Sequence, residues 1–365
     1  MKKKFFSVFF AFCTIFSIFS QNSSEVEDLA LFEDGKVFFE NQNYGEAVKN
    51  LNSAKTARIK KITNKINTLE KSLSPAEVKY SGPHLTDKLP ILREREDWDA
   101  ISIIEYYLNI YSLDFFENNP ENLIEFLKKL KNYPEADFLL GKIFMIEGEY
   151  DIAEKYFSNA YKSSDVLSIP DEKYEILYSL AELCENKKDF NKMEEYLLLI
   201  VSKEPLYRDN NRKKAFENTI SSSKNDCVER FFSLYRAQNY QLVKPFFKLA
   251  EFYQNQNENK KSLYANALGI VTGFSKIIDI IKKRDPNFEY KDLKSFLLEV
   301  QNYSDIVNWG IENSLWKSFN LFAENAYKNS DIIFSRELYK ILSEANPEEY
   351  WKSEAKIKVQ DMLVN

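Results

Sequence analysis

Glycine and proline are scarce in this 365-residue sequence, with 8 and 10 copies respectively. Folds made of many short strands need turn-forming residues at frequent intervals, so this scarcity disfavours an all-β protein. It also disfavours the glycine-rich loops that hold the phosphates of nucleotides. Tyrosine and phenylalanine, by contrast, reach 22 and 29 copies. An all-α chain whose helices pack through aromatic side chains fits this composition best.

Residues and motifs that carry catalysis are equally sparse. The single histidine, His84, lies in a proline-containing segment, without the partners that a catalytic triad or a zinc site needs. No Walker sequence, G-x-G-x-x-G, G-x-S-x-G or C-x-x-C motif occurs. Adjacent acidic residues such as Glu194 and Glu195 are typical of a solvated helix surface. We therefore predict a protein that is not an enzyme and that uses no metal or cofactor.

The first twenty residues have the features of a secretory signal peptide. Lys2, Lys3 and Lys4 precede an apolar run over residues 5–19. That run is shorter than the roughly twenty apolar residues that span a membrane, and polar residues follow it at once. We predict export to the periplasm with removal of residues 1–20, the alternative being an uncleaved N-terminal anchor. Cys13 lies inside the apolar run, and we interpret it as part of that run rather than as a lipidation site.

The chain that remains after this removal is acidic. It carries 47 basic residues against 56 acidic ones, a formal net charge of −9. Such a charge disfavours nonspecific binding to nucleic acids or to anionic membranes. Two cysteines, Cys184 and Cys227, remain. Export permits a disulfide between them, but two buried thiols are the favoured interpretation.

A pattern of small and large residues recurs along the chain and indicates an internal repeat. Three copies begin at Gly35, Gly141 and Ala181, and a looser fourth begins at Ala323. At offsets +3, +12, +16 and +19, the copy at Gly141 has Phe144, Ala153, Phe157 and Ala160. The copy at Gly35 has Phe38, Ala47, Leu51 and Ala54, and the copy at Ala181 has Leu197 at +16 and Pro205 at +24.

This spacing resembles the tetratricopeptide repeat, a helix–turn–helix unit of about 34 residues. The resemblance implies an all-α solenoid. The residue types suit it, since a small residue at the origin lets two helices approach and the +16 residue fills the space between them. A proline at +24 ends the second helix.

The repeats divide the chain into segments. We predict a signal peptide over 1–20, a first repeat with an extended second helix over 21–72, and a proline-containing loop over 73–92. A helical pair and two repeats follow over 93–207, then an irregular helical region over 208–310, then a repeat and a capping helix over 311–365. In the irregular region, 244–254 looks like a first helix, but 262–283 is too long to be its standard partner.

In tetratricopeptide arrays, the first helix of each unit lines a concave groove that binds the ligand. The resemblance therefore implies a partner-binding groove at ten residues: Phe32, Lys36, Phe39, Phe138, Lys142, Met145, Tyr178, Glu182, Glu185 and Asn186. For the apolar members, and for Ile146, the alternative is packing against neighbouring helices. Aromatic side chains beside Glu182 and Glu185 suit an amphipathic or basic segment of another protein.

The sequence thus predicts a non-enzymatic exported scaffold whose partners are envelope or periplasmic proteins. Its richness in Lys, Asn, Phe and Ile, with the Phe-rich signal, is similar to periplasmic tetratricopeptide proteins of spirochaetes. Some of these assemble the collar of the periplasmic flagellar motor. A second interpretation is an accessory protein for solute binding or transport, with an apolar ligand pocket in 208–310. A third is a cell-wall enzyme with clustered carboxylates.

Overall fold

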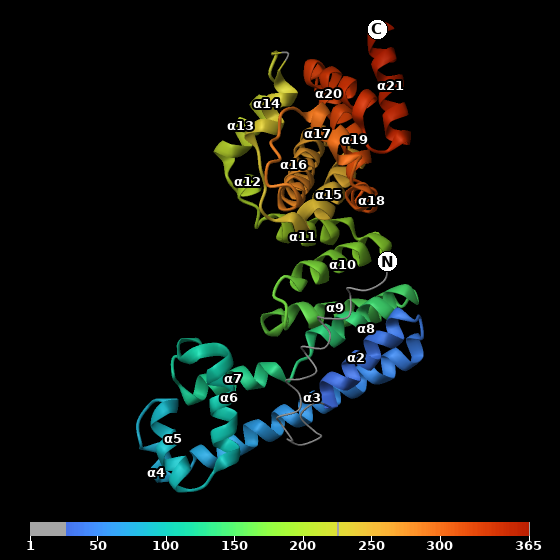
Figure 1. Cartoon of the computed structure of the whole chain (residues 1–365). Helices are drawn as coiled ribbons and strands as arrows, with labels where there is room; N and C mark the ends of the chain where they lie inside the picture. Colours follow the sequence, from blue (N-terminus) through green and yellow to red (C-terminus); the bar gives the residue numbers. More distant parts are fainter. Residues whose placement is uncertain (1–26, 225, 365) are drawn as a thin grey trace, which may run out of the picture. The chain divides into compact units, whose positions relative to one another are not determined.

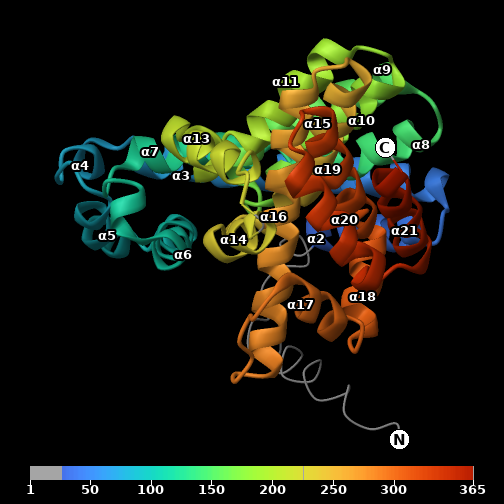
Figure 2. The ribbon, with the colours of Figure 1, turned by 90° about the horizontal axis from the view of Figure 1, so that it is seen from above.

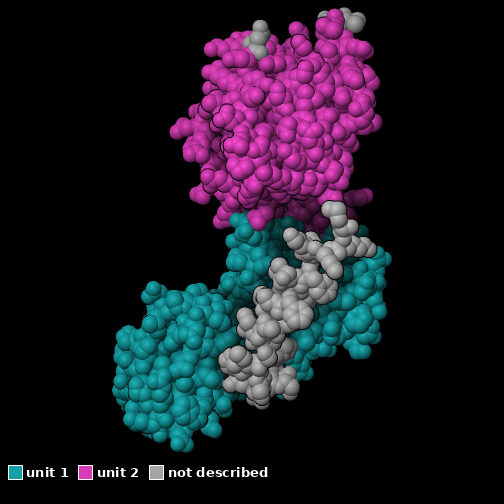
Figure 3. All heavy atoms as spheres, viewed as in Figure 1, with its two compact units in different colours: residues 1–176 teal, residues 177–365 magenta. Residues whose placement is uncertain are grey.

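The computed structural model describes residues 27–224 and 226–364, so the predicted signal peptide lies outside the described residues. The described residues form helices and connecting turns without a β-strand among them, which confirms the all-α prediction. The chain divides into two compact units, residues 1–176 and 177–365 (Figure 3). The division falls within one helix, α10 (Glu172–Asn186).

Unit 1 is organised around the 30-residue helix α3, which contributes to two hydrophobic cores (Figure 1). The first half of α3 packs with α2 and α8, and its second half packs with α5, α6 and α7. Helix α3 thus continues to Leu73, close to the end of the segment 21–72 for which an extended second helix is expected. The helices of unit 1 are α2 (Glu27–Glu40), α3 (Tyr44–Leu73), α4 (Ala76–Lys79), α5 (Leu85–Glu94), α6 (Trp98–Phe115), α7 (Pro120–Leu130), α8 (Pro134–Ile146), α9 (Tyr150–Lys162) and the 3-10 turn η1 (Ser164–Val166).

The two repeat copies predicted in unit 1 are helix–turn–helix pairs, α2 with α3 and α8 with α9. In each pair, the glycine at the origin faces the residue at +16. A β-carbon added to Gly35 would lie 2.9 Å from Leu51 Cδ2, and one added to Gly141 would lie 2.5 Å from Phe157 Cδ1. Both distances are too short for real atoms, so the close approach of these helices depends on glycine.

The segment 73–92 differs from the predicted proline-containing loop, because it contains α4 and most of α5. Pro90 lies inside α5, where proline normally interrupts a helix. Tertiary contacts hold this helix in place: the buried Lys88 ammonium donates hydrogen bonds to the carbonyl oxygens of Val78 and Lys79, each at 2.9 Å. The structure of the segment thus depends on a lysine that joins α5 to α4.

Unit 2 is built around α16, which packs against α15 and α19 (Figures 1 and 2). By length and composition alone α16 could cross a membrane, but 83% of its most apolar window is buried inside the structure, as in the central helix of a folded unit. The elements of unit 2 that follow α10 are α11 (Phe190–Val201), α12 (Pro205–Arg208), α13 (Asn210–Ile220), α14 (Cys227–Leu234), η2 (Tyr240–Leu242), α15 (Val243–Asn255), α16 (Asn259–Arg284), α17 (Leu293–Val300), α18 (Ser304–Glu312), α19 (Leu315–Lys328), α20 (Ile332–Ala345) and α21 (Glu349–Val364).

The C-terminal segment contains the helices α19, α20 and α21. Helices α19 and α20 form a pair, and α21 packs against both. Cys184 and Cys227 are both buried thiols, which confirms the favoured interpretation over a disulfide. Burial and the neighbouring Glu337 carboxylate, 3.3 Å from the sulfur, raise the pKa of Cys227 to about 12. This thiol is therefore protonated and unreactive at neutral pH.

An ion-pair cluster ties the start of α2 to α3. The buried Asp28 carboxylate accepts hydrogen bonds from Lys61 Nζ at 2.9 Å and from Arg58 Nε at 3.2 Å. Burial pushes the pKa of Asp28 upward, but the hydrogen bonds and charges of Lys61 and Arg58 outweigh it and hold this pKa below its usual value. The carboxylate is therefore ionised and contributes to stability at neutral pH.

We expect Asp28→Asn to destabilise unit 1 by about 2 kcal/mol at pH 7, because Lys61 and Arg58 lose a buried charged partner while keeping some contact with water. An aspartate whose folded-state pKa is depressed stabilises the fold above the unfolded pKa of about 3.9, and this contribution disappears as pH falls through the folded-state pKa. Urea unfolding should therefore show a smaller difference between variant and wild type below about pH 4. Asp34→Asn, an exposed change on the same helix, is the control. An equal difference at pH 7 and pH 3 would contradict the role of Asp28.

Candidate partner-binding groove

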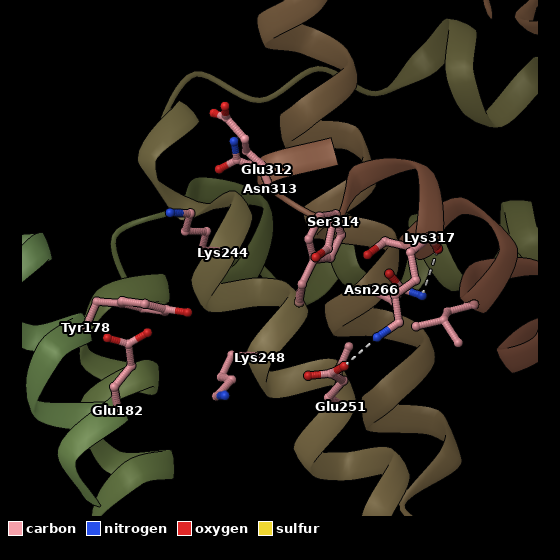
Figure 4. Close-up of a pocket in the computed structure, with 14 residues that line it drawn as sticks. Tyr178, Glu182, Lys244, Lys248, Glu251, Asn266, Glu312, Asn313, Ser314 and Lys317 are labelled. Carbon is pink, nitrogen blue, oxygen red and sulfur yellow. Dashed lines mark hydrogen bonds and ion pairs between the residues drawn. The ribbon is translucent and has the colours of Figure 1, made fainter. Parts of the chain in front are cut away.

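A polar pocket of about 280 Å³ in unit 2 gathers side chains from α10, α15, α16, α18 and α19 and from the turn between α18 and α19 (Figure 4). We call it the unit-2 pocket. Tyr178 and Glu182 reach it from α10, and the aromatic ring of Phe247 comes from α15. Its charged residues are Glu182, Lys244, Lys248, Glu251, Glu312 and Lys317. Three lysines thus match three glutamates, so the pocket has both signs of charge and no net excess of either.

Two ion pairs hold the charged walls of the unit-2 pocket. Lys248 Nζ lies 2.5 Å from Glu185 Oε2 and joins α15 to α10, while Lys317 Nζ lies 3.0 Å from Glu251 Oε1 and joins α19 to α15. Partly exposed pairs of this kind contribute only about 0–1 kcal/mol to stability. Their main effect is to fix the positions of the charged groups around the opening.

Asn266 on α16 provides a buried polar group in the same pocket. It is 1% exposed, and its Nδ2 donates a hydrogen bond to the Ser318 carbonyl oxygen at 3.2 Å (Figure 4). Its Oδ1 has no hydrogen-bond donor among the described residues. A buried acceptor without a donor costs about 1–3 kcal/mol. A ligand that brings an N–H or O–H group to Oδ1 would recover this free energy on binding.

The four predicted groove residues of unit 2 have different positions. Tyr178 and Glu182 line the pocket, Glu185 lies at its edge in the pair with Lys248, and Asn186 is exposed and outside it. Lys248 already pairs with Glu185, so this carboxylate is less available to a basic partner than Glu182, which lines the pocket.

The predicted aromatic residues of unit 1 are largely engaged in packing. Phe32 stacks on Tyr133 with ring centres 5.1 Å apart, and Phe39 lies 6.1 Å from the ring of Tyr44. Phe138 is 8% exposed, and its ring lies 5.9 Å from that of Phe157. Much of the surface of these side chains is therefore buried against neighbouring helices, which was the alternative interpretation for these residues. Met145 is partly buried, whereas Ile146 is 57% exposed.

Lys36 and Lys142, the two predicted groove lysines of unit 1, act on the same carboxylate. Burial raises the pKa of Glu172, the neighbouring Glu135 raises it further, and Lys142 and Lys36 oppose both effects. Lys142 Nζ also lies 4.1 Å from the centre of the Phe138 ring, a favourable cation–π contact. The lysines at equivalent places on α2 and α8 thus both lower the pKa of a carboxyl group at the start of α10.

The sequence analysis missed most of the unit-2 pocket, although one signal was present. Tyr178 and Glu182 stand at offsets −3 and +1 from Ala181, and Phe247 and Glu251 stand at the same offsets from Ala250. Extending the repeat pattern to α15 would have found these two residues. Lys317 and Asn266 follow no such pattern, since they come from helices that only tertiary packing brings to the pocket. Among the described residues, none of the His, Cys, Asp and Glu side chains forms a group of three or more that could bind a metal.

Comparisons with known proteins give relatives but no function. The chain matches no family model. It is 27% identical over 321 residues to a protein of Treponema pallidum (strain Nichols), covering 87% of this chain and 85% of that protein. A protein of Borreliella burgdorferi is 25% identical over 249 residues, covering 60% of this chain and 76% of that protein. Both relatives are spirochaete proteins described only as uncharacterized.

Proposed function

We propose that this protein is an exported, non-enzymatic scaffold of tetratricopeptide type, and that its unit-2 pocket binds a segment of another envelope protein. One observation carries the proposal: an aromatic and a charged residue at the same two repeat offsets, on α10 and on α15, line a single pocket. Binding surfaces of helical repeat proteins are assembled in this way, by equivalent positions of successive units. The glycine-dependent helix pairs of unit 1 support the repeat assignment.

The chemistry of the pocket suits a polypeptide. An aromatic wall accepts an apolar side chain, lysines and glutamates accept side chains of either charge, and Asn266 Oδ1 accepts a hydrogen bond such as a backbone N–H donates. The signal-like N-terminus and the spirochaete relatives favour a partner in the envelope. The collar of the periplasmic flagellar motor is one such assembly.

Site-specific photo-crosslinking tests the proposal. We expect a photoreactive phenylalanine at Tyr178, in the full chain and mixed with envelope extract of the source bacterium, to give one discrete adduct. Lys248→Glu should reduce this adduct at least about ten-fold, because it reverses a charge in the pocket wall and repels Glu185. The same photoreactive residue at Tyr350, which is 62% exposed on α21 and outside the pocket, is the control. Identical adducts from both positions, insensitive to Lys248→Glu, would contradict the proposal.

A small polar solute is a second candidate, because the Asn266 acceptor lies in a pocket close to the lower end of ligand-site volumes, about 300 Å³. This pocket is polar, unlike the apolar one that the sequence analysis considered for 208–310. Thermal unfolding with a set of amino acids, sugars and polyamines distinguishes the two functions. A solute that raises the unfolding temperature of the wild type but not of Asn266→Leu would favour solute binding.

A further inference from the structure

The N-terminal end of α19 lines the unit-2 pocket and is not capped. Ser314, at the N-cap, has a left-handed backbone with φ of 56°, and its side chain accepts no hydrogen bond from the helix. The Ser318 N–H donates to the Ser314 carbonyl oxygen at 3.0 Å. The backbone N–H groups of Leu315, Trp316 and Lys317 have no acceptor among the described residues, and the first turn contains no acidic residue. This end of the helix is therefore partially positive and suits an anionic group.

Asn266 is a second, independent group in the same pocket, and it requires a hydrogen-bond donor. It is 1% exposed, and its Nδ2 donates to the carbonyl oxygen of Ser318, one turn into α19. Its Oδ1 has no donor among the described residues. The start of α19 thus suits an acceptor, whereas Asn266 suits a donor. A ligand that meets both requirements carries a carboxylate and an N–H group close together.

The charges of the pocket agree with such a ligand. Lys248 and Lys317 are each bound to a glutamate. Lys244 and Glu312 also line the pocket, and neither has an ion-pair partner within the described part of the chain. Lys244 is therefore available to a carboxylate, and Glu312 is available to a donor. One available charge of each sign favours a ligand with both kinds of group over one that is purely anionic.

We propose that the unit-2 pocket recognises an aspartate or glutamate residue of the segment that it binds, an inference that rests on the proposed function. The side-chain carboxylate of this residue accepts hydrogen bonds from the N–H groups at the start of α19. Its own backbone N–H donates to Asn266 Oδ1. A free acidic amino acid offers the same chemistry through its carboxylate and ammonium groups, so the test includes both sources.

Nuclear magnetic resonance of one backbone amide in the full chain tests the proposal. Trp316 is the one tryptophan that follows a leucine, so leucine labelled with ¹³C at the carbonyl and ¹⁵N-labelled tryptophan together identify its amide signal. We expect N-acetyl-aspartate-N-methylamide to shift this signal in a saturable manner. N-acetyl-asparagine-N-methylamide has the same shape without the charge, and it should bind at least about ten-fold more weakly. Free aspartate is the third probe.

Substitutions locate the probe within the pocket. Lys244→Glu should weaken binding of the capped aspartate at least about ten-fold, because it replaces an available cation by an anion at an exposed position. Lys340→Glu is the matched control, since it makes the same change at an exposed position on α20 outside the pocket. Asn266→Leu should also weaken binding, because it removes the acceptor for the N–H group of the probe.

Several results would overturn the inference. Equal shifts with the aspartate and asparagine probes would exclude carboxylate recognition, and equal effects of Lys244→Glu and Lys340→Glu would place the probe outside the pocket. Binding of free aspartate at least about ten-fold more tightly than the capped probe would identify a free amino acid as the ligand. Crosslinking from Tyr178 without any shift of Trp316 would contradict only this inference. A saturable shift without crosslinking would support carboxylate recognition but not the envelope partner.

Discussion

Phe157→Ala should destabilise unit 1 by about 3–5 kcal/mol, because it removes a fully buried aromatic ring from the contact between α9 and α8. The ring fills the space that Gly141 leaves open and also lies 5.9 Å from the ring of Phe138. Since small domains have a free energy of unfolding of only about 5–15 kcal/mol, the variant should unfold at a clearly lower urea concentration than the wild type. Hydrogen exchange of the α8 and α9 amides in the full chain measures it locally.

Gly141→Ala isolates the same contact. In the wild-type background, the added β-carbon lies 2.5 Å from the Phe157 ring, and we expect overpacking to cost about 1–3 kcal/mol. In the Phe157→Ala background the ring is absent, so the preference of alanine over glycine in a helix, about 1 kcal/mol, should make Gly141→Ala stabilising. Ile152→Ala, at a 41% exposed position on α9, is the control for general weakening of the helix. The same effect of Gly141→Ala in both backgrounds would show that these residues do not interact.

The contact between Gly141 and Phe157 could be predicted because it is local. A helix, a short turn and a second helix place residues sixteen apart against each other, so the spacing in the sequence predicts which residues are in contact. The helix α5 could not be predicted in this way. Its formation around Pro90 depends on Lys88, whose hydrogen bonds reach carbonyl groups of α4, and proline alone indicated a loop.

The candidate site was predicted in part for the same reason. Tyr178 and Glu182 follow from the repeat, but Lys317 and Asn266 reach the pocket from helices more than eighty residues away in the sequence. Likewise, an apolar pattern in the sequence does not show which of the apolar side chains are buried. Nothing in the sequence distinguishes the buried Ile104 from the exposed Ile110 on α6, because that difference depends on where α3 and α7 pack.

Trp316→Ala should be among the most destabilising changes in unit 2, with an expected loss of about 3–5 kcal/mol. Trp316 is fully buried, its Nε1–H donates a hydrogen bond to the Val307 carbonyl oxygen at 3.0 Å, and its ring stacks on Phe319. A β-carbon added to Gly310 would lie 2.2 Å from this ring, so α18 approaches α19 closely only around the indole. Urea unfolding followed by circular dichroism measures the loss, and Trp98→Ala, at a 61% exposed position, is the control.

The same change should also abolish partner crosslinking from Tyr178, since Trp316 holds the turn that brings Ser314 and Lys317 to the unit-2 pocket. Trp316→Phe separates the two effects. It keeps an aromatic ring in the core but removes the hydrogen bond that the indole donates to the Val307 carbonyl oxygen, which costs about 0.5–1.5 kcal/mol. We expect this variant to fold and to crosslink less than the wild type. Full crosslinking by a folded Trp316→Ala would show that the position of this turn does not determine binding. It would also show that binding in the unit-2 pocket does not depend on the packing of Trp316 in the core.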